Sequence, residues 1–514
     1  MMTRIKPGFT VRKRFQFLNG FMIPMLIFCG ITGHPLSLYA QDYFKMGCME
    51  QDKANLDAAI EDYSKVLKQN PDFTKAYVNR GLCYQDKSEF DLAINDFKKA
   101  LKLKPGDPDI EMSMGTAFFH QKDYQNALTY LDKALEKMPD NANAQFDLGM
   151  TKHELKDYNG ALQAYNTAIG LDPEKGQFYY SRALDKDQLR DYAGALEDCN
   201  SAIKLRPDYE KAYYLRAKEE NQLKLYQKAL IDLSVDIKMN PKNPRYYAEK
   251  GDIEYHQGFL SESILDCDTA IGINSLFAEP YYSKALAERD SGMLDSAKKD
   301  MEMANKLFKG ESPFVDMEMS KILIYSGDYG GAAKSAESAL KINSKYLYAE
   351  YELAYAEVFL GNDSGASRIL SQIIKTDSTF TLAYWLLGRI NYLNGNNASA
   401  TDLFGKGTKT KSDPVGIAYC FAYMGDETKA IGVMKRVIGY YDSLGSKVKW
   451  RDCLGDMAYV YGVTKNEGKF FEYINEALES GYSNKAWIEN SKELDYIRSE
   501  PFYQKLAIRY SLKR

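Results

Sequence analysis

The sequence predicts an all-α fold, an α-solenoid built from stacked helix pairs. Small residues recur every 34 positions, as Gly47, Gly81, Gly115, Gly149, Ala183, Ala217, Gly251 and Ala285. A second series has the same period and lies twelve residues later in each unit, as Ala59, Ala93, Ala127, Ala161, Ala195, Ala229, Ser263 and Ala297. Prolines close six successive units, as Pro71, Pro105, Pro139, Pro173, Pro207 and Pro241. Three series with one period indicate a repeat architecture, in which each unit is stabilised by stacking on its neighbours.

Each unit is expected to hold two amphipathic helices. Between the closing prolines, the apolar residues fall at helical spacing, first around Tyr77 and Gly81 and then from Phe90 to Leu101. A glycine or alanine where two helices cross lets a neighbouring aromatic ring lie against the backbone. Because proline cannot continue a helix, each unit ends where the next one begins.

The unit that ends at Pro105 is similar to a known family pattern. Its signature residues are Tyr77, Gly81, Tyr84, Phe90, Ala93, Phe97, Ala100 and Pro105. They resemble the tetratricopeptide repeat, with aromatic substitutions, and the resemblance covers roughly residues 40 to 441. It implies a right-handed α-solenoid whose activity is protein binding, and it names no partner.

The chain divides into four segments. Residues 41–441 are predicted to form about eleven good repeats and a shortened twelfth, with a one-residue slip of register near Ser312. Serines replace the closing proline in later units, which predicts softer turns or helices extended by part of a turn; they are Ser344, Ser378 and Ser412. Residues 442–480 are expected to form a degenerate helical pair. Residues 481–514 are interpreted as a capping segment that covers the last apolar face with Ile497, Phe502, Tyr503 and Leu506.

Residues 1–40 are interpreted as a secretory signal peptide. Five basic residues precede an apolar stretch over residues 21–31, and the small Ala40 suits a signal peptidase. We therefore expect an exported, periplasmic protein; an uncleaved signal or a lipid anchor at Cys29 would instead hold it on the membrane, facing the periplasm. The chain has a formal net charge of −4, more negative still without its basic start, which argues against a nucleic-acid partner.

A row of aromatic residues is the candidate ligand groove. In stacked helix pairs, the first helix of each unit lines the concave side, and the residue after its leading aromatic should point into the groove. Seven of eleven such positions are aromatic, namely Phe44, Phe146, Tyr180, Tyr214, Tyr282, Tyr351 and Trp385. Tyrosine and tryptophan offer large contact area at little entropic cost, so a peptide could stack on this ladder. The same rings could instead fill space between first helices, or hold a saccharide.

The other motifs do not predict a carboxylate clamp, a metal site or a catalytic site. At the matching groove positions of the first three repeats, only Asn79 is of the residue type that the family's lysine and asparagine clamp for a C-terminal carboxylate requires, so the sequence does not support clamp-type docking. The histidines His120, His153 and His256 are interpreted as polar groove residues, since a metal site would need a third ligand. The phosphate-loop-like stretch 405–408 lacks the full motif spacing and follows a predicted helix rather than a strand. The S-x-x-K stretch 201–204 lies inside a predicted second helix.

We therefore expect a non-enzymatic scaffold or adaptor of the bacterial envelope, with no catalytic residue, metal or cofactor. A catalytic module hidden in the degenerate region after about Asp413 is the alternative from the enzyme class. Cys199 and Cys267 share one inward position two periods apart and are expected in the core. Charged residues of the second helices are expected on a solvated surface; they include Lys98, Lys99, Asp132, Lys133, Glu197 and Asp198.

Overall fold

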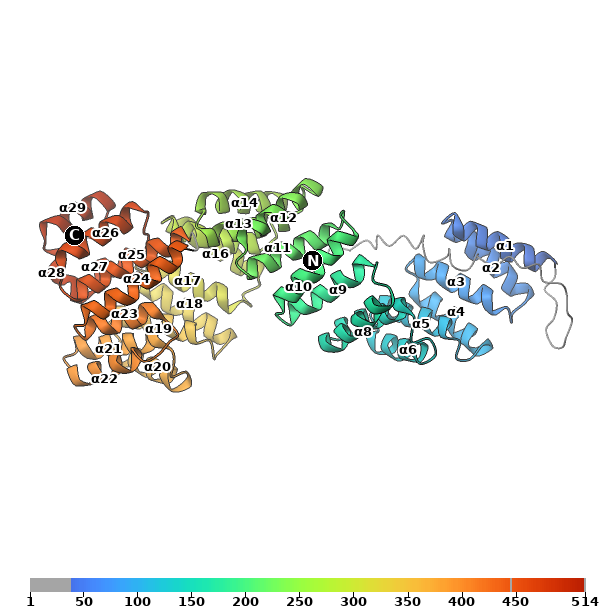
Figure 1. Cartoon of the computed structure of the whole chain (residues 1–514), viewed down its shortest axis with the longest axis horizontal. Coiled ribbons are helices and arrows are strands. Elements are labelled where there is room, and N and C mark those ends of the chain that lie inside the picture. Colours follow the sequence, from blue (N-terminus) through green and yellow to red (C-terminus); the bar gives the residue numbers. More distant parts are fainter. Residues whose placement is uncertain (1–37, 444–445, 513–514) are drawn as a thin grey trace. The chain divides into compact units, whose positions relative to one another are not determined.

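The computed structural model describes residues 38–443 and 446–512, which form helices and the turns that join them. The proposed signal peptide lies outside the described residues up to position 37, and its expected end at Ala40 falls in the first turn of the first helix. The chain packs into two compact units, one ending at Leu155 and one beginning at Lys156. In each unit, antiparallel helix pairs follow one another in chain order (Figure 1). The predicted all-α solenoid of stacked helix pairs is confirmed.

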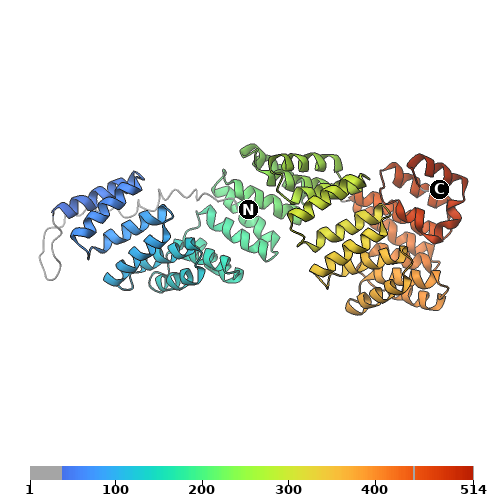
Figure 2. The same cartoon turned by 180° about the vertical axis from the view of Figure 1, so that it is seen from behind.

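The described part of the first unit holds helices α1 to α7 (Figure 2, blue and cyan). They are α1 (Leu38–Asp52), α2 (Leu56–Gln69), α3 (Thr74–Asp86), α4 (Phe90–Leu103), α5 (Pro108–Gln121), α6 (Tyr124–Lys137) and α7 (Ala142–Glu154). The odd-numbered helix of each pair is the first helix of a repeat. The closing prolines lie in the turns between pairs, as predicted: Pro105, for example, comes two residues after α4 ends.

The second unit continues the series with helices that alternate in the same way. Its first half contains α8 (Tyr158–Leu171), α9 (Gly176–Gln188), α10 (Tyr192–Leu205), α11 (Glu210–Gln222), α12 (Tyr226–Met239), α13 (Pro244–Gln257), α14 (Leu260–Ile273), α15 (Glu279–Asp290) and α16 (Leu294–Leu307). The following pairs are α17 (Pro313–Tyr325), α18 (Tyr329–Ile342), α19 (Leu347–Phe359), α20 (Asp363–Thr376), α21 (Thr381–Leu393), α22 (Asn397–Gly407), α23 (Pro414–Tyr423) and α24 (Glu427–Ser443). Helices that end at serine-closed turns are not extended, because α18 and α20 have the usual 14 residues and α22 has only 11.

One residue in left-handed conformation joins the two helices of most pairs and marks the repeat register. These residues are Ala54, Ser88, Lys122, Lys156, Arg190, Lys224, Gly258, Gly292, Gly327, Gly361 and Gly395. Their spacing is 34 throughout, except for 35 between Gly292 and Gly327, so the predicted slip near Ser312 is confirmed. Gly425 follows after 30 residues, four fewer than the usual spacing.

The small residues are needed for close helix packing within each pair. A Cβ atom on Gly81 would lie 2.6 Å from the Phe97 ring, and one on Gly47 would lie 2.7 Å from the Tyr63 ring. Real Cβ atoms do not approach so closely, so the glycine lets the ring rest on the helix backbone. Cys199 and Cys267 are fully buried, as expected.

Buried ion pairs join the two helices of several units and correct one expectation. Arg182 donates two hydrogen bonds to the Asp198 carboxylate, at 2.8 and 2.5 Å, and a third to Asn166 of the preceding repeat at 2.6 Å. Asp198 is only 3% exposed, so the expectation of a solvated surface was wrong for this residue. Its position on the helix faces the first helix of its own pair, where a buried carboxylate needs a cation. Arg80 and Arg216 make the same bridges to Asp96 and Asp232.

The segment after α24 forms one more helix pair and a short tail. The elements are α25 (Lys447–Val463), α26 (Glu467–Glu479), α27 (Ala486–Asn490), η2 (Lys492–Leu494), α28 (Asp495–Arg498) and α29 (Pro501–Tyr510). Three of the four residues proposed to cap the last apolar face are buried: Ile497, Tyr503 and Leu506. Phe502 is 47% exposed, although its ring centroid lies 4.9 Å from that of Phe471 in α26.

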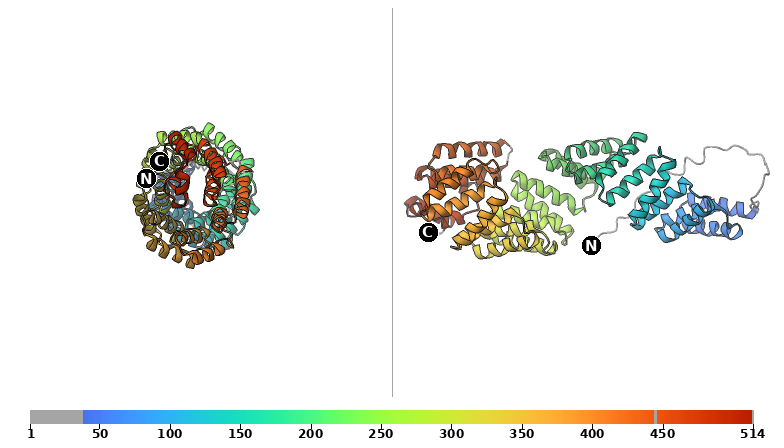
Figure 3. Two further views of the ribbon diagram at one scale, coloured as in Figure 1. Left: turned by 90° about the vertical axis from the view of Figure 1, so that its left-hand side faces the viewer. Right: turned by 90° about the horizontal axis from the view of Figure 1, so that it is seen from below.

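The C-terminal elements also return to the concave side of the second unit. Arg451 of α25 donates a hydrogen bond of 2.9 Å to the Asp290 carbonyl at the end of α15. Asn490 donates one of 3.2 Å to the Tyr329 hydroxyl. Each contact joins residues 161 positions apart in sequence. The red helices therefore lie inside the curve of the yellow and orange ones, as the end-on view of Figure 3 shows.

Candidate functional site

Two concave sites of the second unit include residues of the predicted aromatic ladder. The first, called here the groove pocket, has a volume of about 490 Å³ and is built by α11, α13 and α15. Tyr214 and Tyr282 line it together with Ala248, Glu249 and Asp252. The structure thus brings two predicted ladder residues into one pocket, from first helices two repeats apart.

The floor of the groove pocket is acidic. Asn221 donates hydrogen bonds to Glu249 at 3.0 Å and to Asp252 at 3.2 Å, which holds the two carboxylates close together. Burial and the charge of Asp252 raise the pKa of Glu249 to about 7, while the bond from Asn221 opposes the rise. Arg245 and Glu279 line the rim and are exposed. A cationic group that entered this pocket would restore the charged form of Glu249.

The two tyrosines of the groove pocket, Tyr214 and Tyr282, are half-buried. The Tyr214 ring lies 5.4 Å from that of Tyr246, and burial raises the pKa of both Tyr214 and Tyr282. Each ring therefore packs against the solenoid with one part and lines the pocket with another. Tyr180 lies one repeat earlier, with its ring 5.0 Å from that of Tyr209, and burial raises its pKa to about 12.

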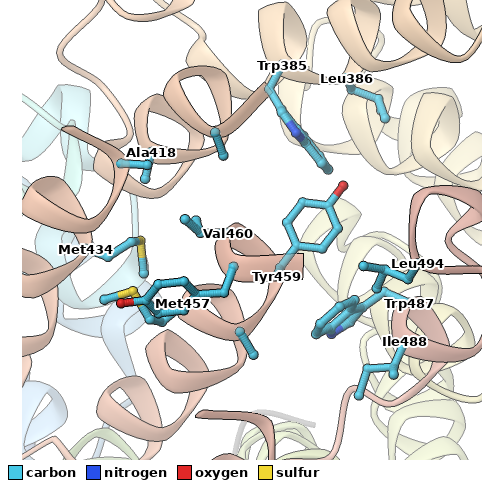
Figure 4. Packing of buried hydrophobic residues seen from close by; sticks show 14 of the residues in the cluster. Trp385, Leu386, Ala418, Met434, Met457, Tyr459, Val460, Trp487, Ile488 and Leu494 are labelled. Carbon is cyan, nitrogen blue, oxygen red and sulfur yellow. The ribbon is translucent and has the colours of Figure 1, made fainter. Parts of the chain in front are cut away.

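The second site, called here the inner cavity, has a volume of about 370 Å³ and lies between the solenoid and its own C-terminal segment. First helices α17, α19, α21 and α23 line it on one side, and α25 with residues 482–491 on the other. Tyr351 and Trp385 of the predicted ladder belong to this site and are 7% and 6% exposed. The Trp385 ring lies 4.9 Å from that of Tyr419 and 6.2 Å from that of Tyr459, which in turn contacts Trp487 (Figure 4).

The remaining ladder residues lie in the first unit. Phe44 packs edge-on against Phe73 with ring centroids 5.0 Å apart, and Phe146 is 5% exposed. Asn79, of the clamp residue type, donates a hydrogen bond of 3.3 Å to the Tyr63 hydroxyl of the preceding repeat. His120 stacks on Phe90 with ring centroids 5.6 Å apart, and His256 lies 3.6 Å from Asp252. The described residues contain no group of three or more histidine, cysteine or acidic side chains placed to hold a metal ion.

An ion pair anchors the wall that closes the inner cavity, and sequence reasoning missed it. Arg389 donates two hydrogen bonds to the Glu493 carboxylate, at 2.7 and 2.8 Å. The hydroxyls of Tyr423 and Tyr459 donate two more, at 2.6 and 2.5 Å. Burial alone would raise the pKa of Glu493, but the charge of Arg389 and these hydrogen bonds lower it to about 2. Partners 104 residues apart leave no periodic signal that could have revealed them.

The repeat pattern and the comparisons define the class of protein. Models of the tetratricopeptide repeat match residues 42–73, 74–107 and 109–174. The chain is a tetratricopeptide repeat protein, and proteins of this class are protein-interaction scaffolds. None of the curated proteins compared matches the chain. Among the described helices, none combines the length and apolar character needed to cross a bilayer.

Several solved structures resemble parts of the chain. MamA from Desulfovibrio magneticus RS-1 is 18% identical, covering 34% of this chain and 98% of that one, with a TM-score of 0.32. YrrB, described as a TPR protein with an unusual peptide-binding site, is 26% identical, covering 35% of this chain and 92% of that one, with a TM-score of 0.31. Yeast Tom70 is 16% identical, covering 78% of this chain and 96% of that one, with a TM-score of 0.40.

Proposed function

We propose that this protein is a non-enzymatic scaffold or adaptor that holds a segment of a partner protein in the groove pocket. The observation that carries the proposal is the pairing of Tyr214 and Tyr282 over the acidic floor made by Glu249 and Asp252. Tyrosine rings give contact area, and buried carboxylates select a cation. The partner segment therefore carries a lysine or arginine side chain, flanked by apolar residues that contact the rings.

The groove pocket lies outside the part of the second unit's concave side that the C-terminal segment fills. Near α17 to α23, the C-terminal segment of the chain itself occupies the inner side, through contacts such as those of Asn490 and Glu493. The groove pocket lies before that region, and its rim residues Arg245 and Glu279 are exposed. A segment in extended or helical form can therefore reach the floor without displacing the C-terminal elements.

The test is binding to arrays of peptides that differ only in one basic residue. Peptides with lysine or arginine should bind, and replacement of that residue by glutamine should abolish binding. Tyr214→Ala with Tyr282→Ala should weaken binding at least tenfold, whereas Tyr440→Ala, which removes a ring 51% exposed on α24, should not. Equal binding of the basic and neutral peptides would refute the proposed selectivity.

We also propose that the protein is exported to the periplasm of a bacterium and acts in the envelope. The support is the basic start of the sequence, the apolar stretch that follows it, and the small Ala40. The intact mass of the exported protein tests this: a chain that starts at Gln41 agrees with the proposal. Retention of Met1 would contradict signal cleavage and favour a membrane-anchored form.

A further inference from the structure

The inner cavity is a built chamber whose polar groups are not all satisfied by the protein. The indole N–H of Trp385 and the amide oxygen of Asn484 are buried and have no hydrogen-bond partner. Trp385 is 6% exposed, and both residues line the cavity. Buried polar atoms are nearly always paired, because an unpaired one costs about 1–3 kcal/mol. A donor and an acceptor left open in one cavity indicate a ligand that offers the complementary groups.

The charges around the cavity leave an excess of carboxylates. The two buried arginines are already neutralised, Arg289 by Asp290 and Glu318, and Arg389 by Glu493. Lys321 also pairs with Glu318, at 3.0 Å. Lys449 is the one lining cation among the described residues for which no ion pair is found. Four further carboxylates line the cavity, those of Glu352, Asp413, Asp452 and Asp456, and the charge of Lys449 acts on Asp452 and Asp456.

The four carboxylates differ in the hydrogen bonds that they accept from the protein. Asp456 accepts a hydrogen bond of 2.5 Å from the Tyr419 hydroxyl, and Asp413 accepts two from the backbone at the start of α23. Asp452 receives one of 3.3 Å from Arg451. No hydrogen bond to Glu352 is found among the described residues, and burial raises its pKa to about 7 against the opposing charge of Lys321. Burial likewise raises the pKa of Asp456 to about 7.

The aromatic walls suit a cation as well. Trp385, Tyr419, Tyr459 and Trp487 form one continuous cluster of rings that lines the same cavity as the carboxylates. Figure 4 labels three of them, Trp385, Tyr459 and Trp487. A cation over such a ring gains about 0.5–2 kcal/mol, most when it is desolvated. The cavity volume of about 370 Å³ falls in the range of about 300–1,000 Å³ typical of small-molecule sites. A chamber of this size between packed walls suits a small molecule better than an extended peptide.

We propose that the inner cavity binds a small organic cation that also carries an acceptor oxygen, of the chemical class of the basic amino acids. Its ammonium or guanidinium group lies between Glu352 and Asp456, against the aromatic walls. Its acceptor oxygen takes the hydrogen bond of the Trp385 indole, and one of its N–H groups donates to the Asn484 oxygen. This site is separate from the groove pocket, so the inference does not rest on the proposed protein binding.

The test is isothermal titration of the full chain with L-arginine and L-lysine at pH 8, with citrulline as the neutral isostere of arginine. At least one of the two basic amino acids should bind, and citrulline should bind at least tenfold more weakly. Glu352→Gln should reduce the affinity at least tenfold, and Trp385→Phe, which keeps the ring and removes the N–H, should reduce it several-fold. Glu249→Gln, in the groove pocket, should leave this affinity unchanged.

Three outcomes would overturn the inference. They are no binding of either basic amino acid, equal binding of citrulline or a neutral hexose, and an unchanged affinity in Glu352→Gln. Glutamine at position 352 keeps the shape of the side chain and removes a buried charge, so the variant folds and its loss of binding has a direct meaning. Peptide binding at the groove pocket, measured on the same variant, separates failure of this inference from failure of the proposed function.

Discussion

Removal of the Glu493 carboxylate should detach the C-terminal segment from the concave side. In the variant Glu493→Ala, Arg389 would keep its charge, 3% exposed, with neither of the two hydrogen bonds that it now donates. An uncompensated buried charge costs about 3–5 kcal/mol, and we expect a loss of that size. The ion pair Lys406–Asp402 is the matched control: its side chains are 56% and 62% exposed, so Asp402→Ala should change stability by less than about 1 kcal/mol.

The assay is denaturant unfolding followed by tryptophan fluorescence, since Trp385 precedes Arg389 by four residues and Trp487 precedes Glu493 by six. The double variant Arg389→Met with Glu493→Leu should recover most of the loss, because it removes both charges.

The contribution of this ion pair to the free energy of unfolding should also depend on pH. The pKa of Glu493 is below its ordinary value of 4.5, so the stabilisation is full above that pH and disappears as the pH falls towards 2. A loss below about 1 kcal/mol in Glu493→Ala would show that this pair does not anchor the segment.

Three further predictions concern packing, bridging and charge. Gly388→Ala should lower stability by about 1–3 kcal/mol in thermal unfolding, because its Cβ would clash with the buried Phe404 ring. Gly405→Ala is the control: it adds a methyl group in open space on a helix and should raise stability by about 0.5–1 kcal/mol. Asp232→Ala should cost about 1–3 kcal/mol, since it leaves Arg216 without its paired carboxylate; a neutral result in urea unfolding would contradict the bridge. The raised pKa of Glu352 means that folding favours its protonated form, so the stability of the wild type should fall as the pH rises from about 4.5 to 7. The variant Glu352→Gln should therefore be more stable than the wild type by about 1–3 kcal/mol at pH 8, and no more stable than it at pH 4.

The repeat fold could be read from the sequence because its causes are local and periodic. Gly81 stands opposite Phe97 within one helix pair, and the same spacing returns in other units, as between Gly47 and Tyr63 or Gly388 and Phe404. The bridge from Arg182 to Asp198 also has a sequence signal that could have been used. Repeats with Arg80, Arg182 or Arg216 at this position carry an aspartate sixteen residues later, whereas Met114 and Leu148 are followed there by Tyr130 and Ala164.

The candidate sites were only partly accessible to sequence reasoning. Tyr214 and Tyr282 were expected in the groove, and the structure places them in one pocket. Whether the ladder contacts a ligand stays a prediction, since Phe146, Tyr351 and Trp385 are largely buried. The inner cavity depends on the curvature of the solenoid, which brings residues 104 to 161 positions apart into contact. Curvature sums small rotations between many units, and no single repeat encodes it.

The most direct test of protein binding in the groove pocket is site-specific photo-crosslinking in cells that produce the protein. A photoreactive residue replaces Arg245 on the pocket rim in one variant and Ile231, 64% exposed on α12, in another. We predict that position 245 captures a specific protein through a segment with a basic residue, and that Tyr214→Ala with Tyr282→Ala abolishes the capture. The same proteins captured from positions 245 and 231, with no effect of the two alanines, would contradict the assignment of the groove pocket as the binding site.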